Sequence, residues 1–398
     1  MFEALARVPE DPLLAVSTAF RADPSADKID LGVGVYRDDS GNTPVPAAVQ
    51  EAERQLLAAQ TSKTYLSPIG NPGFNQRLTS LVLGAVGASR GAQAIGVQGP
   101  GGSGALRLGA ELLRLARPDT RLLVSKPTWA NHIPLLGGAG LAIDSYPYYE
   151  IHTHGVDFDA MLAQLEQQPA GNTIVLHACC HNPTGADLTL SQWEALTEII
   201  KRRELLPFID LAYQGLADDL ETDVAGLRLM CALVPEALIA VSCSKNFGLY
   251  RERTGLLIVL TPSGERSSIV AAQLGRVART LYSMPPDHGA AIVERVLSDS
   301  TLLGGWKREL ATMTQRINGL RAALADALTE ATQLDYSWIK SQRGMFSKLD
   351  LSADSVRALR DQHHVFTAPD GRLNIAGLRT TTVERVAHAI AAVSRDAN

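Results

Sequence analysis

Short apolar runs alternate with helical stretches between residues 94 and 210, and this alternation limits the fold more than any other feature of the sequence. The apolar runs have the length of buried strands, and they occupy residues 95–98, 121–125, 173–177 and 206–210. The intervening helices are predicted over residues 104–116, 158–167 and 190–203. Two further runs continue the pattern at residues 237–243 and 255–260. Repeated βα units predict an α/β fold with a mostly parallel central sheet and helices on both of its faces.

The chain has 398 residues, which is enough for one large domain and one smaller domain. Prolines interrupt the first residues, so we expect an N-terminal arm that belongs to the small domain or to a dimer contact. After residue 300, apolar residues recur every three or four positions and predict a long helix that links the domains. The predicted division is the arm 1–26, the large domain 27–300, the linking helix 301–330 and the small domain 331–398.

The last part of the chain is predicted to form a small α+β domain. Strands are expected at residues 337–350 and 365–375, on either side of a helix at residues 352–362. A final helix is expected at residues 382–395.

Composition argues against several classes of partner. The net charge is −5 and the basic residues are scattered, so neither nucleic acid nor a membrane surface is expected as a partner. No apolar stretch approaches the roughly 20 residues of a membrane-spanning helix. The first residues are charged where a signal peptide is apolar. The four cysteines have neither disulfide nor metal-binding spacing, and we predict a cytoplasmic protein that acts on small molecules.

Lys245 follows the predicted strand 237–243, at the strand end where α/β proteins bind their ligands. A lysine held there among apolar neighbours loses solvation, which lowers its pKa and lets it form a Schiff base with an aldehyde. Ser242, Ser244 and Arg253 lie close to it in sequence and suit a phosphate group. The set suggests an aldehyde cofactor that carries a phosphate, although Lys245 alone would also fit a solvated loop.

A glycine-rich segment, residues 99–104, follows one predicted strand and opens a helix, where free backbone N–H groups can bind phosphate. Its letters also match the GxGxxG pattern of dinucleotide-binding proteins, so an NAD-dependent oxidoreductase is an alternative. Pro100 lacks an N–H in this segment, and the next strand ends at Ser125 without the acidic residue that would bind a ribose.

Other candidates for ligand binding lie at further strand ends. Asp210 would pair with a protonated pyridine nitrogen or cap a helix, and Tyr213 could donate its phenol to a ring oxygen. Trp129 would stack on a planar ring or fill the core, and Asn182 would bind a ligand or form a turn. Gly34, in a run that alternates glycine with larger residues, is a candidate for lining a pocket.

Together these residues resemble the fold-type I, class I aminotransferases, in the branch that acts on aspartate and aromatic amino acids. The resemblance extends from the first residue to the C-terminal helix. Its motifs are Ser242-x-Ser244-Lys245-Asn246-Phe247-Gly248-x-x-x-x-Arg253-x-Gly255, Cys179-Cys180-His181-Asn182-Pro183-Thr184-Gly185 and Asp210-x-Ala212-Tyr213-Gln214-Gly215.

The resemblance implies that pyridoxal 5′-phosphate binds covalently to Lys245, with Lys245, Tyr213 and Asp210 as the catalytic residues. It places His132 and His177 around the cofactor ring, and no metal is expected. Tyr65 would reach the phosphate from a neighbouring subunit. The implied cofactor-binding residues are Lys245, Gly102, Ser103, Trp129, Asn182, Asp210, Tyr213, Ser242, Ser244, Arg253 and Tyr65.

The resemblance also implies that two arginines bind the substrate. Arg372 would hold the α-carboxylate through two parallel hydrogen bonds. Arg279 would reach across a dimer to the side-chain carboxylate of aspartate or glutamate. Gly34, Trp129 and Asn182 complete the implied substrate-binding residues.

The sequence leaves the choice between the two branches open. Ser103 and residues 342–347 resemble the aromatic branch, whereas Val35 and Thr43 resemble the aspartate branch, and Met284 matches neither. We expect a homodimeric aminotransferase that transfers the amino group of tyrosine, phenylalanine or L-aspartate to 2-oxoglutarate by a ping-pong mechanism. A dedicated aspartate aminotransferase is the alternative within the class. Two alternatives from other classes of protein remain open: an NAD-dependent oxidoreductase and a non-catalytic protein of the same fold.

Overall fold

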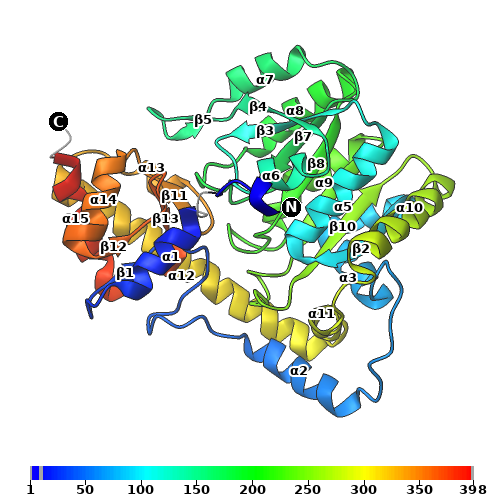
Figure 1. Cartoon of the computed structure of the whole chain (residues 1–398), viewed down its shortest axis with the longest axis horizontal. Coiled ribbons are helices and arrows are strands. Elements are labelled where there is room, and N and C mark those ends of the chain that lie inside the picture. The colour runs from blue at the N-terminus through cyan, green and yellow to red at the C-terminus, as the bar shows by residue number, and fades with distance from the viewer. Residues whose placement is uncertain (1, 9–11, 396–398) are drawn as a thin grey trace. The chain divides into compact units, whose positions relative to one another are not determined.

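The computed structural model describes residues 2–8 and 12–395, and these form two compact units (Figure 1). The large unit comprises Pro44–Asn182 and Ala186–Gln315. The small unit comprises Met1–Thr43, Pro183–Gly185 and Arg316–Asn398.

A seven-stranded sheet forms the centre of the large unit, in the order β2-β10-β9-β8-β7-β3-β4. All neighbouring strands are parallel except at β10, which is antiparallel to both β2 and β9. The predicted α/β fold with a mostly parallel sheet is therefore confirmed. The strands are β2 (Ala94–Pro100), β3 (Arg121–Lys126), β4 (Ala142–Pro147), β7 (Thr173–His177), β8 (Leu206–Leu211), β9 (Ala237–Ser242) and β10 (Thr254–Leu260).

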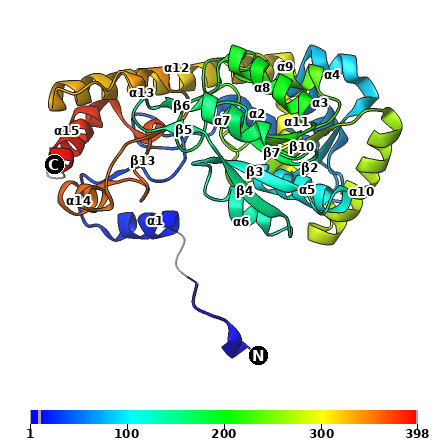
Figure 2. The same cartoon turned by 90° about the horizontal axis from the view of Figure 1, so that it is seen from above.

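Helices cover both faces of this sheet because its central strands are apolar on both sides. Every residue of β7, β9 and β10 is buried. One face packs its valine and leucine side chains against α5, α6 and α10, and α8 and α9 lie on the opposite side (Figure 2). The covering helices are α5 (Gly101–Ala116), α6 (His132–Gly137), α8 (Leu190–Arg202), α9 (Ala225–Leu233) and α10 (Gly264–Tyr282).

The carboxyl ends of β7, β8 and β9 meet at one edge of the sheet, since these strands are parallel. The reversed strand β10 contributes its amino end to this edge, where Gly255 is paired with Ser242. Arg253, just before β10, therefore comes to the same edge as the residues that follow β9.

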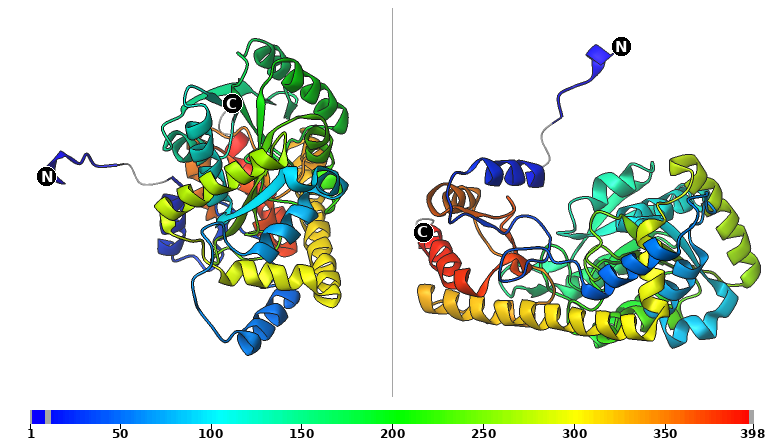
Figure 3. Two further views of the ribbon diagram at one scale, coloured as in Figure 1. Left: turned by 90° about the vertical axis from the view of Figure 1, so that its right-hand side faces the viewer. Right: turned by 90° about the horizontal axis from the view of Figure 1, so that it is seen from below.

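The small unit contains two short strand pairs. Strand β1 (Ile29–Asp30) is parallel to β12 (Val365–Phe366), and β11 (Phe346–Lys348) is antiparallel to β13 (Arg372–Asn374). Helix α1 (Pro12–Ala22) packs onto the first pair, with the rings of Phe20 and Phe366 5.3 Å apart. Helices α14 (Ala353–His363) and α15 (Val383–Arg395) contact each other, as the orange and red helices of Figure 3 show.

Helix α12 (Ser300–Thr332) matches the predicted long helix, and the division between the units falls inside it, after Gln315. Its buried residues repeat the apolar spacing of the sequence, with Trp306, Leu310 and Ile317 among them. Within residues 2–8 and 12–395, no helix is both long and apolar enough to cross a membrane.

Residues 27–43 belong to the small unit, whereas the sequence analysis assigned them to the large domain. The reason is strand pairing: β1 joins β12, and the N–H of Asn374 donates to the carbonyl of Leu31 at 2.8 Å. A strand of two residues has no recognisable sequence pattern, so its partner could not be foreseen.

The two long strands predicted in the small unit are wrong in extent. Residues 337–350 contain a short helix, α13 (Trp338–Ser341), and only the three residues of β11 are extended in a ladder. The predicted strand 365–375 is interrupted by a turn at Gly371, whose φ of 80° is the left-handed conformation that glycine tolerates. The apolar runs were correct indicators of burial but not of continuous strands.

Candidate active site

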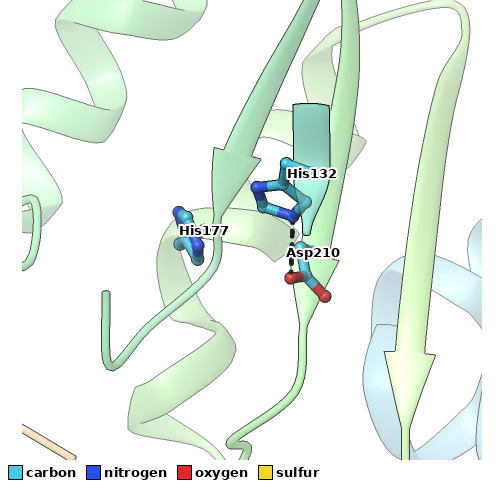
Figure 4. Close-up of side chains that lie close together, drawn as sticks. All are labelled: His132, His177 and Asp210. Atoms are coloured by element: carbon cyan, nitrogen blue, oxygen red, sulfur yellow. Dashed lines mark hydrogen bonds and ion pairs between the residues drawn. The ribbon is translucent and has the colours of Figure 1, made fainter. Parts of the chain in front are cut away.

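Asp210 lies at the end of β8, where only 7% of its surface is exposed. Its Oδ2 is 3.2 Å from Nε2 of His132, the first residue of α6 (Figure 4). A carboxylate only accepts hydrogen bonds, so Nε2 of His132 donates to it, while Nδ1 of the same ring lies 2.8 Å from the Thr128 hydroxyl. Burial raises the pKa of Asp210, but the hydrogen bond from His132 and the positive charge of its neighbours, to which Lys245 makes the smallest contribution, outweigh it, so this pKa lies below its ordinary value. The edge of the sheet therefore holds a buried negative charge.

His177, the last residue of β7, lies beside this pair, with its ring centroid 5.2 Å from that of His132 (Figure 4). Burial, followed by the charge of His132, lowers the pKa of His177 to about 3. His177 is therefore neutral at pH 7, and both of its ring nitrogens are buried without a hydrogen-bond partner.

Asp210, His132 and His177 also have the composition of a metal site, with one ligand atom from each within 4.8 Å of the others. Zinc–ligand bonds of about 2.0–2.1 Å would place neighbouring ligand atoms roughly 3.4 Å apart in a tetrahedral site. The proton that His132 shares with Asp210 occupies the nitrogen a metal would need. The cluster is thus better suited to a cationic ring than to a metal.

Lys245 follows β9 and is half-buried, with Nζ 4.9 Å from the centroid of the Tyr213 ring. Tyr213 is buried and comes from the segment that follows β8, so two neighbouring strands bring the amine and the phenol together. The charge of Lys245 reaches Asp210, since it contributes to lowering the pKa of that carboxyl group.

Trp306 of α12 holds the turn that carries Lys245 in place. The indole Nε1 donates to the carbonyl of Asn246 at 2.7 Å. The indole ring also stacks on Phe247, with centroids 4.3 Å apart and planes 8° from parallel. Since both neighbours of Lys245 on its C-terminal side are held, its backbone has little freedom to move.

The glycine-rich segment and the end of β9 form a cradle suited to phosphate. Arg253 donates from Nη1 to Oγ of Ser244 at 3.3 Å, and a Cβ on Gly101 would collide with its guanidinium group. A Cβ on Gly102 would lie 2.9 Å from Cβ of Ser242. Free N–H groups at the start of α5, two hydroxyls and a guanidinium therefore converge at one place.

Three further predicted residues of the large unit lie near this edge. Trp129 is half-buried, and its ring meets that of His132 edge to face, with centroids 5.3 Å apart and an interplanar angle of 84°. Asn182 is buried with 5% of its surface exposed, and Ser103 is the third residue of α5.

Arg372 and Gly34 lie in the small unit and share one neighbour there. The guanidinium of Arg372 lies 4.3 Å from the centroid of the Phe346 ring, and Nη2 donates to the carbonyl of Gly32 at 2.8 Å. A Cβ on Gly34 would lie 2.8 Å from the tip of the same phenyl ring. A larger residue at position 34 would therefore displace the ring that supports Arg372.

Comparisons with known proteins decide the family. A family model described as aminotransferase class I and II matches residues 26–390. The chain belongs to this family. This aminotransferase is 47% identical to the tyrosine aminotransferase of Rhizobium meliloti over 97% of this chain and 98% of that protein. It is 40% identical to the aspartate aminotransferase of Escherichia coli over 99% of this chain and 100% of that protein.

A solved structure shows the same likeness in three dimensions. It is the aromatic-amino-acid aminotransferase of Burkholderia pseudomallei, covalently bound to pyridoxal phosphate, with a TM-score of 0.96 and 41% identity over 99% of both chains. The predicted enzyme class, a transaminase that depends on pyridoxal phosphate, is confirmed. The alternative of an NAD-dependent oxidoreductase has no support.

The residues of this aminotransferase fit pyridoxal phosphate. The cradle of Arg253, Ser244 and the start of α5 matches a phosphate dianion. The buried charge of Asp210 matches a protonated pyridine nitrogen, and the amine of Lys245 matches an aldehyde.

Tyr65 and Arg279 of this aminotransferase are directed to solvent rather than packed into the large unit. Tyr65 lies between α2 (Ala47–Ala59) and α3 (Pro72–Leu83) and is 86% exposed. Arg279 is exposed in the last turn of α10. Met284 lies near Tyr65, because the N–H of the next residue, Leu66, points at the Met284 sulfur at 3.3 Å.

The side chains that hold the predicted residues in place were not predicted from the sequence. Thr128 orients His132, Trp306 holds the turn after Lys245, and Phe346 supports Arg372. Of the three, only Thr128 could have been found from the sequence, because it lies four residues before His132. The other two are contributed by distant parts of the chain.

Proposed function

We propose that this aminotransferase transfers the amino group of tyrosine, phenylalanine or L-aspartate to 2-oxoglutarate by a ping-pong mechanism. The observation that carries the proposal is the buried, charged Asp210 at the same sheet edge as Lys245 and the phosphate cradle. Relatives named for tyrosine, for aromatic amino acids and for aspartate all match the chain over nearly its full length, which supports a dual range.

Asp210 keeps the cofactor reactive through its charge. Bound pyridoxal phosphate supplies an electron sink for the electron pair that remains when the α-proton of the amino acid is removed. Asp210 stabilises a proton on the ring nitrogen because a buried carboxylate without a cationic partner is costly. His132 and Thr128 hold the carboxylate in place for this role.

Lys245 binds the cofactor and then acts as a general acid and base. With the cofactor bound, its Nζ would take the proton from the α-carbon of the substrate and hold it for return. The centroid of the Tyr213 ring lies 4.9 Å from Nζ, and its phenol would donate to the ring oxygen of the cofactor. Trp129 would stack on the cofactor ring, and Asn182 would bind the same oxygen as Tyr213.

Arg372 and Arg279 select and orient the substrate. Arg372 binds the α-carboxylate, since a guanidinium can form two parallel hydrogen bonds with it and so fix the C–H bond to be broken. Arg279 binds the side-chain carboxylate of aspartate or 2-oxoglutarate. Gly34 leaves room for the Phe346 ring on which Arg372 rests.

The functional unit in this proposal is a homodimer with shared active sites. Tyr65 and Arg279 reach from one subunit to the phosphate and the substrate of the other, which accounts for their exposure in a single chain. We place the enzyme in the cytoplasm, because the four cysteines, all within the described residues, are buried and form no disulfide, as suits a reducing compartment.

Replacing Lys245 with alanine tests the proposal. The wild-type protein should absorb visible light as a lysine-bound pyridoxal phosphate does, and Lys245→Ala should lose this band together with all turnover. A colourless wild type or an active variant would contradict the role of Lys245. The kcat/KM values of the wild type for aspartate, tyrosine and phenylalanine, each with 2-oxoglutarate, then distinguish a dual enzyme from a dedicated aspartate aminotransferase.

A further inference from the structure

Gln98 of β2 connects the segment that follows Tyr65 to the segment that follows Arg279. Its side chain is completely buried. Oε1 accepts from the N–H of Asn71 at 2.9 Å, and Nε2 donates to the carbonyl of Pro286 at 2.7 Å. One amide side chain therefore satisfies a backbone group in each of the two segments.

Gln98 packs tightly against the segment that follows Tyr65. The N–H of Gln98 donates to the carbonyl of Ile69 at 3.0 Å, and a Cβ on Gly70 would collide with the Gln98 side chain. Gly70 has a φ of 87°, so it needs glycine for its conformation as well. The backbone that leads from Tyr65 into α3 is thereby held against β2.

Asn71 strengthens the connection between the same two segments. Its Nδ2 donates to Oδ1 of Asp287 at 3.2 Å, and its Oδ1 caps α3 by accepting from the N–H of Phe74 at 3.0 Å. The N–H of Leu66 lies 3.3 Å from the sulfur of Met284. The two segments thus meet at several points, and Gln98 lies at the buried centre.

We infer that Gln98 is a positioning residue that sets where Arg279 and Tyr65 are presented to the partner's active site. The inference rests on the proposed function, in which both side chains act across the dimer. Neither segment can shift relative to β2 without leaving a buried polar group of Gln98 unsatisfied. Gln98 thereby links the selectivity for dicarboxylic substrates to the retention of the cofactor.

Gln98→Leu keeps the approximate size of the side chain and removes both hydrogen bonds. For the holoenzyme we expect kcat/KM for aspartate to fall about tenfold or more, mainly through KM, while that for phenylalanine falls less than about threefold. Loss of pyridoxal phosphate during dialysis should also become faster. Equal losses for the two amino acids, or unchanged kinetics, would overturn the inference.

Gln93 provides the matched control. It precedes β2 at the opposite end, and its Nε2 donates to the carbonyl of Pro262 at 3.1 Å, so it makes the same kind of bond to a proline carbonyl. Gln93→Leu should leave the ratio of aspartate to phenylalanine activity unchanged. A changed ratio in this variant would show that the effect is not specific to Gln98.

A second variant and a double variant keep the test valid if Gln98→Leu does not fold. Gln98→Glu retains the acceptor for Asn71 and loses the donor to Pro286, so it should impair aspartate turnover with little effect on cofactor retention. If Gln98 acts through Arg279, adding Gln98→Glu to Arg279→Ala should cause no further loss with aspartate. Additive losses would contradict the inference.

A wild type that turns over neither amino acid would instead contradict the proposed function.

Discussion

At the scale of single residues, the site contains both a buried charge and a buried neutral base. Asp210 is ionised because His132 donates a hydrogen bond to it and Lys245 supplies positive charge. His177, at the end of the next strand, is kept neutral by burial and by the charge of His132. The two environments differ because Asp210 has polar partners and the ring nitrogens of His177 have none.

The depressed pKa of His177 predicts a loss of stability in acid. The folded-state pKa is about 3, whereas a histidine in an unfolded chain titrates near 6.5. Between these pH values the unfolded chain binds one more proton than the folded chain, so stability falls as the pH falls. From pH 7 to pH 5 this residue should cost about 2 kcal/mol of unfolding free energy.

Urea unfolding of the wild type and of His177→Phe at pH 7 and pH 5 measures this contribution. Phenylalanine has a similar shape and cannot take up a proton, so the variant should lose less stability between the two pH values. His388 is exposed, and His388→Gln is the control that should keep the pH dependence of the wild type. If the wild type and His177→Phe lose the same stability, His177 is not the group responsible.

The candidate residues at or just beyond strand ends could be predicted from the sequence, because the sequence shows where an apolar run ends. Lys245 and Asp210 both belong to this group. Phe346 and Trp306 do not, because their importance arises from contacts with residues far away in the chain.

At the scale of elements, the close approach of β10 to the start of α5 holds the phosphate cradle together. A Cβ on Gly255 would collide with the backbone of Gly101 and approach the nitrogen of Gly102 within 2.8 Å. Backbone cannot yield as a flexible side chain can. The helix would have to move away from β10, and its free N–H groups would move with it.

Gly255→Ala should therefore weaken both the fold and cofactor binding. We expect a loss of about 1–3 kcal/mol in unfolding free energy, as is typical of overpacking, and a lower affinity of the apoenzyme for pyridoxal phosphate. Gly319→Ala in α12 is the control: an added Cβ there meets nothing within 4 Å, and alanine favours helix by about 1 kcal/mol. Wild-type cofactor affinity in Gly255→Ala would rule out the proposed displacement of α5.

Buried, uninterrupted elements were predicted best. Strand β7 has the predicted bounds, because the sheet buries every one of its residues. Strand β4 was missed because it lies at the edge of the sheet and buries only one of its six residues, so its sequence shows no apolar run.

At the scale of the whole molecule, the proposed dimer makes each active site depend on two chains. A mixture of subunits tests this directly. Lys245→Ala and Arg279→Ala homodimers should each be poor catalysts with aspartate. A heterodimer of the two would contain one site with a native lysine and an arginine from its partner, and it should show roughly half of the wild-type activity per dimer.

Co-expression of the two variants with different affinity tags allows the heterodimer to be isolated and assayed. If Arg279 served the site of its own chain, neither site of the heterodimer would be complete and no activity would return. Recovery therefore distinguishes a shared site from an independent one, and the homodimers of each variant are the controls.

The reversed direction of β10 has a consequence for how the enzyme is assembled. Strands β9 and β10 are adjacent and antiparallel, so residues 243–253, which include Lys245, form a hairpin connection. Hairpins form in microseconds because their ends are close in sequence, whereas pairing of β10 with β2 joins segments that are far apart. The lysine and Arg253 can thus acquire their relative positions early, and the glycine-rich segment of the cradle is added when β2 completes the sheet.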